Sequence, residues 1–172
     1  MAQRTIAATA ALALRPAQTA DSARLAAIWN HEVRATTATT DTETRDAAAQ
    51  RAWLGAHTAR YPVVVAAVHD AIAGYATLTA YRPKPAFDRT VEDSVYVDRR
   101  WRGRGVGRAL LAHLLEHARA LGHHSVLARI TADNAPSRRL HEALGFRLIG
   151  VEEEVAFKLG RWLDVAVYQR RV

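Results

Sequence analysis

A glycine- and arginine-rich segment between an apolar strand and an amphipathic helix constrains the fold of this chain more than any other feature. Gly103, Gly105 and Gly107 alternate with other residues just before the helical pattern begins. Glycines at this spacing let the backbone approach a ligand, and the unpaired N–H groups of a first helical turn attract an anion. Arginines that would surround a pyrophosphate lie at positions 99, 100, 102, 104 and 108. The segment predicts a phosphate-binding loop, with a flexible turn as the alternative.

The glycine spacing separates this loop from two common nucleotide-binding motifs. A dinucleotide-binding fold needs three glycines at wider spacing and an acidic residue about 20 residues later. A Walker loop needs Gly-Lys-Ser/Thr. Neither pattern is present here, so the sequence favours a different class of anion-binding fold.

Hydrophobic periodicity divides the chain into helices and strands. Helices are expected over 22–33, 45–58, 106–121 and 134–144, the first two capped by Asp21 and Thr44. Strands are expected over 12–14, 63–68, 72–81, 90–97, 125–130, 146–155 and 163–170. Loops are expected over 34–43, which is rich in threonine, and over Arg82-Pro83-Lys84-Pro85. A strand–helix–strand order in the second half implies at least one parallel pair in a mixed sheet.

Composition narrows the class of protein and the chemistry. The chain has 172 residues, 49% of them hydrophobic and 24% charged, which is typical of a folded globular domain. We expect a ragged, alanine-rich extension over 1–10 and one domain over 11–172. The absence of cysteine excludes disulfides, thiolate catalysis and zinc ribbons. The net charge of +7 favours an anionic ligand, either nucleic acid or a polyanionic small molecule.

Patterns along the chain also bear on cellular location, on metal binding and on nucleic-acid binding. The apolar runs are too short to span a bilayer, so we expect no membrane association and a cytoplasmic protein, with a short signal peptide over 6–14 as the alternative. His113-Leu114-Leu115-Glu116-His117 formally matches a zinc motif, but the sequence nominates no third ligand, and we expect no metal. The tryptophans are too scattered for a nucleic-acid stacking platform.

The loop and several other segments resemble a known family. The spacing Arg102-x-x-Gly105-x-Gly107 after a Val-Tyr-Val strand resembles the pyrophosphate-binding motif of the GNAT acetyltransferase superfamily. Further segments resemble its phosphinothricin N-acetyltransferase branch: Asn30-His31-Glu32-Val33, Thr37-Ala38-Thr39, Gly74-Tyr75-Ala76, 82–87, 90–97, 140–146 and 160–164. The resemblance implies an α/β (α+β) fold with a mixed, mostly antiparallel twisted sheet of about seven strands, a splayed parallel pair and four helices. It also implies acetyl-CoA as co-substrate and a homodimer.

The resemblance assigns acetyl-CoA to residues on three segments. The expected contacts are Val95, Val97, Arg102, Gly103, Arg104, Gly105, Val106, Gly107, Arg108, Asn134 and Ser137. The amide of Val97 is the expected oxyanion donor, because the family's cofactor strand leaves N–H groups free where it splays. Helix capping is the alternative role for Asn134.

Two side chains are candidates for proton transfer. Glu92 lies in an otherwise apolar strand, where partial burial raises the pKa of a carboxyl group toward that of a useful base. The resemblance favours it over Asp93, which alternation places on the other face; the alternative is a carboxylate paired with an arginine. The resemblance also places His141 where the family has its general acid, although a polar neighbour of the core is the other reading.

The resemblance implies that the acceptor is a small amino acid such as phosphinothricin, methionine sulfoximine or methionine sulfone. Arg82 is placed to bind its carboxylate or its tetrahedral acidic group, with a surface arginine as the alternative, and Glu32 and Thr40 belong to the expected acceptor site. The branch often has an aromatic residue where Thr40 stands, which predicts a looser pocket. Two other functions stay open: acetylation of protein N-termini or polyamines, and binding of coenzyme A without catalysis.

Overall fold

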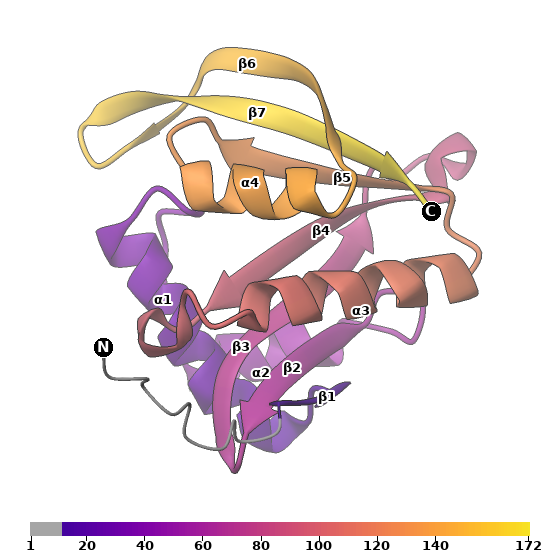
Figure 1. Cartoon of the computed structure of the whole chain (residues 1–172). Helices are drawn as coiled ribbons and strands as arrows, with labels where there is room; N and C mark the ends of the chain where they lie inside the picture. The colour runs from indigo at the N-terminus through magenta and orange to yellow at the C-terminus, as the bar shows by residue number, and fades with distance from the viewer. Residues whose placement is uncertain (1–11) are drawn as a thin grey trace, which may run out of the picture.

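The computed structural model describes residues 12–172, so the extension expected over 1–10 lies outside the described residues. Seven strands form one sheet, with four α-helices between them (Figure 1). The strands are β1 (Leu12–Pro16), β2 (Val63–Val68), β3 (Ala71–Ala80), β4 (Thr90–Val97), β5 (Ser125–Thr131), β6 (Arg147–Lys158) and β7 (Arg161–Arg171). The helices are α1 (Ser22–Ala35), α2 (Ala47–Gly55), α3 (Val106–Ala120) and α4 (Ala135–Ala143). The expected order of elements and the mixed sheet are confirmed; one domain over 11–172 stays a prediction.

The sheet has the order β1-β2-β3-β4-β5-β7-β6, and among the neighbouring strands in residues 12–172 only β4 and β5 run parallel. Their register covers three pairs, from Thr90 with Ser125 to Glu92 with Leu127. Both strands continue beyond these pairs, so they diverge after Glu92. The expected splayed parallel pair is therefore present.

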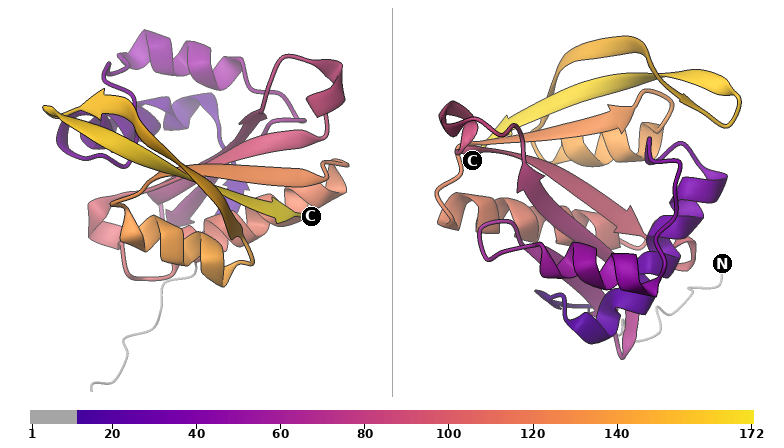
Figure 2. Two further views of the ribbon diagram at one scale, coloured as in Figure 1. Left: turned by 90° about the horizontal axis from the view of Figure 1, so that it is seen from above. Right: turned by 180° about the vertical axis from the view of Figure 1, so that it is seen from behind.

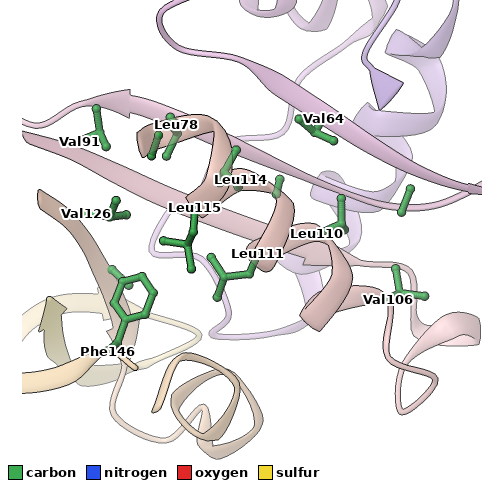
Figure 3. Close-up of a cluster of buried hydrophobic side chains, with 14 of the residues drawn as sticks. Val64, Leu78, Val91, Val106, Leu110, Leu111, Leu114, Leu115, Val126 and Phe146 are labelled. Atoms are coloured by element: carbon green, nitrogen blue, oxygen red, sulfur yellow. The ribbon is translucent and has the colours of Figure 1, made fainter. Parts of the chain in front are cut away.

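The helices cover the two faces of the sheet (Figure 2). On one face the apolar side of α3 packs against the middle strands, around Leu110, Leu111 and Leu114, which are all fully buried (Figure 3). On the other face α1 and the neighbouring α2 pack against β2 and β3, where Trp29 and Tyr75 are buried. The sheet thus separates two apolar clusters, and side chains that alternate along a strand belong to different clusters.

The second helix begins later than the sequence predicts. The expected cap was Thr44, but Asp46 caps α2 by accepting a hydrogen bond from Ala49 N at 2.7 Å. The reason is tertiary, because the Asn30 side chain on α1 donates to Arg45 O at 2.8 Å and accepts from Arg45 N at 2.9 Å. Both backbone groups of Arg45 are thereby used, and the helix starts after it.

The last two strands are longer than expected and form a tight hairpin. The sequence predicts a connection over 156–162, whereas β6 continues to Lys158 and β7 begins at Arg161. Leu159 and Gly160 both have positive φ, 51° and 77°, as a two-residue hairpin turn of the type that matches strand twist requires. Across the described residues, no helix is long and apolar enough to cross a membrane.

Candidate active site

A cavity of about 550 Å³ lies where β4 and β5 diverge. Its walls come from the end of α1 and the following loop, the last five residues of β4, the glycine loop, the middle of β5 and the first turns of α4. The lining includes Glu32 and Thr36 from the α1 side of the sheet and Leu140 and His141 from the α4 side, so the cavity reaches both sides of the sheet.

The glycine loop forms one end of this cavity. Gly103 and Gly105 have φ of 72° and 83°, which only glycine adopts without strain, and a Cβ on either would meet no atom within 4 Å. The first helical bond of α3 runs from Ala109 N to Gly105 O at 3.0 Å, so the N–H groups before Ala109 make no bond within the helix. The loop therefore offers open space and unpaired donors, which suit a diphosphate.

The loop is held from two sides. Asp98 accepts from Arg100 N at 2.8 Å and forms an ion pair with Arg24 of α1. Arg102 donates from Nε to Val97 O at 3.1 Å and from Nη2 to Glu32 of α1. These contacts fix the loop relative to β4 before any ligand binds.

The free edge of β4 carries the expected oxyanion donor. Tyr81 N donates to Thr90 O and Asp98 N donates to Ala73 O, so the even-numbered residues of β4 direct their polar backbone groups toward β3. The amides of Val95 and Val97 consequently point the other way, toward the gap between β4 and β5. Both residues line the cavity.

Glu92 lies at the point of divergence, on the opposite face of β4 from Asp93. Its side chain is half-buried and is not part of the cavity wall. Burial raises the pKa of Glu92 above its ordinary value, and the charges of Asp93 and Glu152 act in the same direction, while Arg129 and Arg82 oppose it. A raised pKa makes the carboxylate of Glu92 a stronger base than an exposed glutamate.

His141 and Asp93 form a buried pair on the α4 side of the cavity. His141 Nε2 lies 3.0 Å from Asp93 Oδ2, and Nδ1 lies 2.8 Å from Ser137 O. The two side chains are 3% and 1% exposed. Both ring nitrogens face acceptors, and only the imidazolium can donate from both. Burial lowers the pKa of His141, but the Asp93 bond and charge, with the Ser137 carbonyl, raise it above its ordinary value.

The expected contacts on α4 lie beside the cavity. Asn134 and Ser137 both line it. Asn134 also caps α4, since its Oδ1 accepts from Ser137 N at 3.2 Å. The capping role considered for Asn134 is therefore present together with a position at the cavity.

Of the three residues expected at the acceptor site, Glu32 lines the cavity, whereas Thr40 and Arg82 do not. Glu32 lines the cavity and is 2% exposed, but its carboxylate is bound by Thr36 Oγ1 at 2.8 Å as well as by Arg102. Thr40 is exposed and is not a lining residue, whereas Thr36 and neighbouring residues of the same loop are. Arg82 is exposed outside the cavity wall, and its guanidinium lies 4.8 Å from the Tyr81 ring.

Asp93, Arg129 and Lys158 are among the polar residues at or next to the site that were not assigned roles from the sequence. Arg129 lines the cavity, and its charge within an otherwise apolar strand could have identified it as a candidate site residue from the sequence. Lys158 is buried at the end of β6 and donates to Glu32 O at 3.2 Å and Thr39 O at 2.6 Å. Its role depends on contact between the end of the β6–β7 hairpin and the distant loop that contains Thr39, and no sequence pattern predicts this contact.

His113 and His117 lie next to each other on α3, with ring centroids 4.3 Å apart. Over residues 12–172, no group of three or more His, Cys, Asp or Glu side chains is arranged to hold a metal ion.

A family model, sequence relatives and solved structures all relate this chain to acetyltransferases. Residues 25–146 match the family model described as the acetyltransferase (GNAT) family. L-amino acid N-acyltransferase MnaT of Escherichia coli is 40% identical over 159 residues, covering 92% of each chain. Phosphinothricin N-acetyltransferase of Streptomyces coelicolor is 40% identical over 166 residues, covering 94% of this chain and 97% of its own.

The fold agrees with solved structures. A putative acetyltransferase from Salmonella typhimurium, solved with its cofactor acetyl-CoA, superimposes with a TM-score of 0.91 at 38% identity and covers 94% of both chains. The loop motif, the fold and relatives aligned over nearly their whole length lead to one conclusion: this chain is an acyltransferase that belongs to the GNAT acetyltransferase family.

Proposed function

We propose that this protein transfers the acetyl group of acetyl-CoA to the α-amine of a small amino acid such as phosphinothricin, methionine sulfoximine or methionine sulfone. The observation that carries the proposal is the divergence of β4 and β5 beyond the Glu92–Leu127 pair. It opens a cavity that begins at the phosphate loop and reaches the strand on which Glu92 lies. The names of the relatives in Escherichia coli and Streptomyces coelicolor support a small amino-acid acceptor.

The contacts to the co-substrate are proposed to come from the phosphate loop and from β4. The N–H groups at the start of α3 and Arg102 and Arg108, which line the cavity, would bind the pyrophosphate. Arg104 lies outside the cavity wall, with its guanidinium 5.2 Å from the centre of the Trp101 ring, and is proposed to assist from the loop. The thioester arm would lie along the free edge of β4, as an added strand does. The amide of Val97 would then donate to the thioester carbonyl as negative charge develops on its oxygen.

Proton transfers accompany the reaction. Glu92 takes a proton from the acceptor's ammonium group, directly or through a water, and leaves a neutral amine that attacks the thioester carbonyl. The nitrogen of the tetrahedral intermediate carries one surplus proton, which it loses to solvent as the carbon–sulfur bond breaks and the amide forms. The departing thiolate needs a proton. His141 is the proposed donor, because Asp93 and Ser137 O favour its protonated form.

The acceptor's acidic groups require cationic partners. Arg82 is proposed to bind an acidic group of the acceptor, since it shares the neighbourhood of Glu92. Glu32 and the loop through Thr40 are proposed to form the wall near the end of α1. Glu32 contributes indirectly, by holding Arg102 of the phosphate loop.

We also propose a homodimer in the cytoplasm, where a co-substrate such as acetyl-CoA is available. The support for the dimer is a set of large apolar side chains on the β6–β7 hairpin, each 46–57% exposed: Leu148, Ile149, Val151, Val155, Phe157, Leu159 and Trp162. An exposed apolar face of this extent on an edge strand is typical of an interaction surface. The hairpin also holds the acceptor loop through Lys158, so a partner would lie close to the acceptor site.

One assay tests the proposed activity. Consumption of acetyl-CoA is followed with methionine sulfone, methionine sulfoximine and phosphinothricin, and in parallel with polyamines and N-terminal peptides. We expect turnover with the amino acids. Turnover confined to polyamines or peptides would contradict the acceptor class, and acetyl-CoA binding without turnover of any acceptor would indicate a binding module.

A further inference from the structure

Arg129 lies in the cavity wall at the point where the parallel pair has separated. It follows Leu127, the last residue of β5 to pair with β4, by two positions. Val126, Ala128 and Ile130 belong to the apolar cluster on the α3 face. Alternation therefore directs Arg129 to the other face, which is the face of Glu92.

The positive charge of Arg129 lowers the pKa of Glu92. Its effect on this pKa is larger than that of the Arg82 charge. Arg129 is thus the cation most strongly coupled to the proposed base, and it lies on the strand next to it.

The partner of Arg129 is exchangeable. Its Nη2 donates to Glu152 Oε2 on β6, and the two side chains are 39% and 40% exposed. Ion pairs at this exposure contribute little to stability, so little opposes replacement of one carboxylate by another. A guanidinium can bind a carboxylate through two parallel hydrogen bonds.

The geometry of an α-amino acid limits where the group that binds its carboxylate can lie. Its amine and its carboxylate are attached to the same carbon, so the group that binds the carboxylate must lie within a side chain's reach of the base. Arg129 meets this requirement from inside the cavity wall. Arg82 approaches from an exposed loop, with its guanidinium over Tyr81 and Phe87, and suits a group farther along the acceptor.

We propose that Arg129 binds the α-carboxylate of the acceptor, exchanging Glu152 for it, and so makes the enzyme selective for α-amino acids over simple amines. The inference rests on the proposed amino-acid acetyltransferase function. It adds a specificity-determining residue: Arg129 binds the α-carboxylate, and Arg82 binds the oxygen atoms of the distal tetrahedral group.

The test compares one acceptor with and without its carboxylate. Steady-state kinetics with methionine sulfone and with its α-carboxamide are measured for wild type and Arg129→Gln. We expect the variant to raise KM for methionine sulfone by about 10- to 100-fold, the effect of losing a charge-assisted bidentate contact, and to leave KM for the carboxamide and for acetyl-CoA unchanged. Arg129→Lys, which keeps the charge but loses the planar fork, should give an intermediate KM.

Two further variants control for charge and for the internal ion pair. Arg147→Gln removes the same charge from an exposed position on β6 outside the cavity and should leave both KM values unchanged. Glu152→Gln frees Arg129 and should lower KM for methionine sulfone about two- to fivefold.

The outcomes separate this inference from the proposed function. Wild-type turnover of methionine sulfone with an unchanged KM in Arg129→Gln would overturn the role of Arg129 alone. An equal rise in KM for the acid and the carboxamide would also overturn it. Absence of wild-type turnover with any amino acid would overturn the proposed function and this inference with it.

Discussion

Gly105 has a φ of 83°, which favours glycine, and a side chain on it would enter the space where we expect the diphosphate to bind. We expect Gly105→Asp to weaken acetyl-CoA binding by more than about 100-fold, because the side chain and its negative charge enter the space of the diphosphate. Isothermal titration calorimetry measures the affinity. Gly122→Asp is the matched control, since Gly122 has φ of 77°, equally open surroundings and a position at the other end of α3. Equal affinities in the two variants would show that the loop does not hold the cofactor.

Glu92 is predicted to act in the chemical step rather than in binding. Glu92→Gln should lower kcat by about 10²–10⁴-fold and leave both KM values near those of wild type. In wild type, kcat/KM should fall as the pH drops through the pKa of Glu92, which burial raises above its ordinary value, because the base must be deprotonated. Full activity of the variant across the pH range would remove Glu92 from the mechanism.

Asp93 is predicted to position and charge His141. Asp93→Asn keeps a side chain of the same size but removes the charge that favours the imidazolium. The pKa of His141 should fall, and the alkaline limb of the kcat profile should move to lower pH, because a general acid is lost when the pH exceeds its pKa. The pKa is followed by NMR titration of the His141 ring. An unmoved limb together with a lowered ring pKa would exclude His141 as the acid.

At the scale of elements, the close approach of β4 to β3 depends on Gly74. A Cβ at this position would lie 2.6 Å from Tyr96 O, so Gly74→Ala must push the two strands apart next to Val97. We expect a loss of about 1–3 kcal/mol in the free energy of unfolding and weaker acetyl-CoA binding, because the Val97 amide moves. Denaturant unfolding and calorimetry measure the two effects.

Gly150→Ala on β6 is the control for that change, since a Cβ there meets no atom within 4 Å. It should alter the free energy of unfolding by no more than about 0.5 kcal/mol. A Gly74→Ala variant as stable as this control would show that β3 and β4 tolerate the displacement.

At the scale of the whole molecule, the exposed face of the β6–β7 hairpin predicts self-association. Phe157 and Trp162 form an exposed edge-to-face pair with ring centroids 5.3 Å apart. Trp162→Glu should convert a dimer to a monomer in sedimentation velocity and raise KM for the acceptor, while acetyl-CoA affinity stays unchanged. Ala23→Glu places the same charge on an exposed position of α1 and should leave the dimer intact. A wild-type monomer at micromolar concentration would contradict the predicted homodimer.

The sequence by itself determined the order of the elements and the family, and it predicted the phosphate loop. These features are local, because hydrophobic periodicity, helix capping and glycine spacing are properties of short stretches of chain. The loop could be recognised from its three alternate glycines. Gly103 and Gly105 have positive φ, which glycine adopts without strain, and a Cβ on Gly107 would lie 3.3 Å from the Leu140 side chain.

Only the tertiary structure decided which side chains meet. Asp93 and His141 are 48 residues apart, and Lys158 reaches Thr39 across 119 residues. Arg129 could be seen as a charge in an apolar strand, but its place beside Glu92 follows from the single parallel pairing and its early end. Pairings of this kind depend on strand order and register, which are set by burial over the whole sheet rather than by any local pattern.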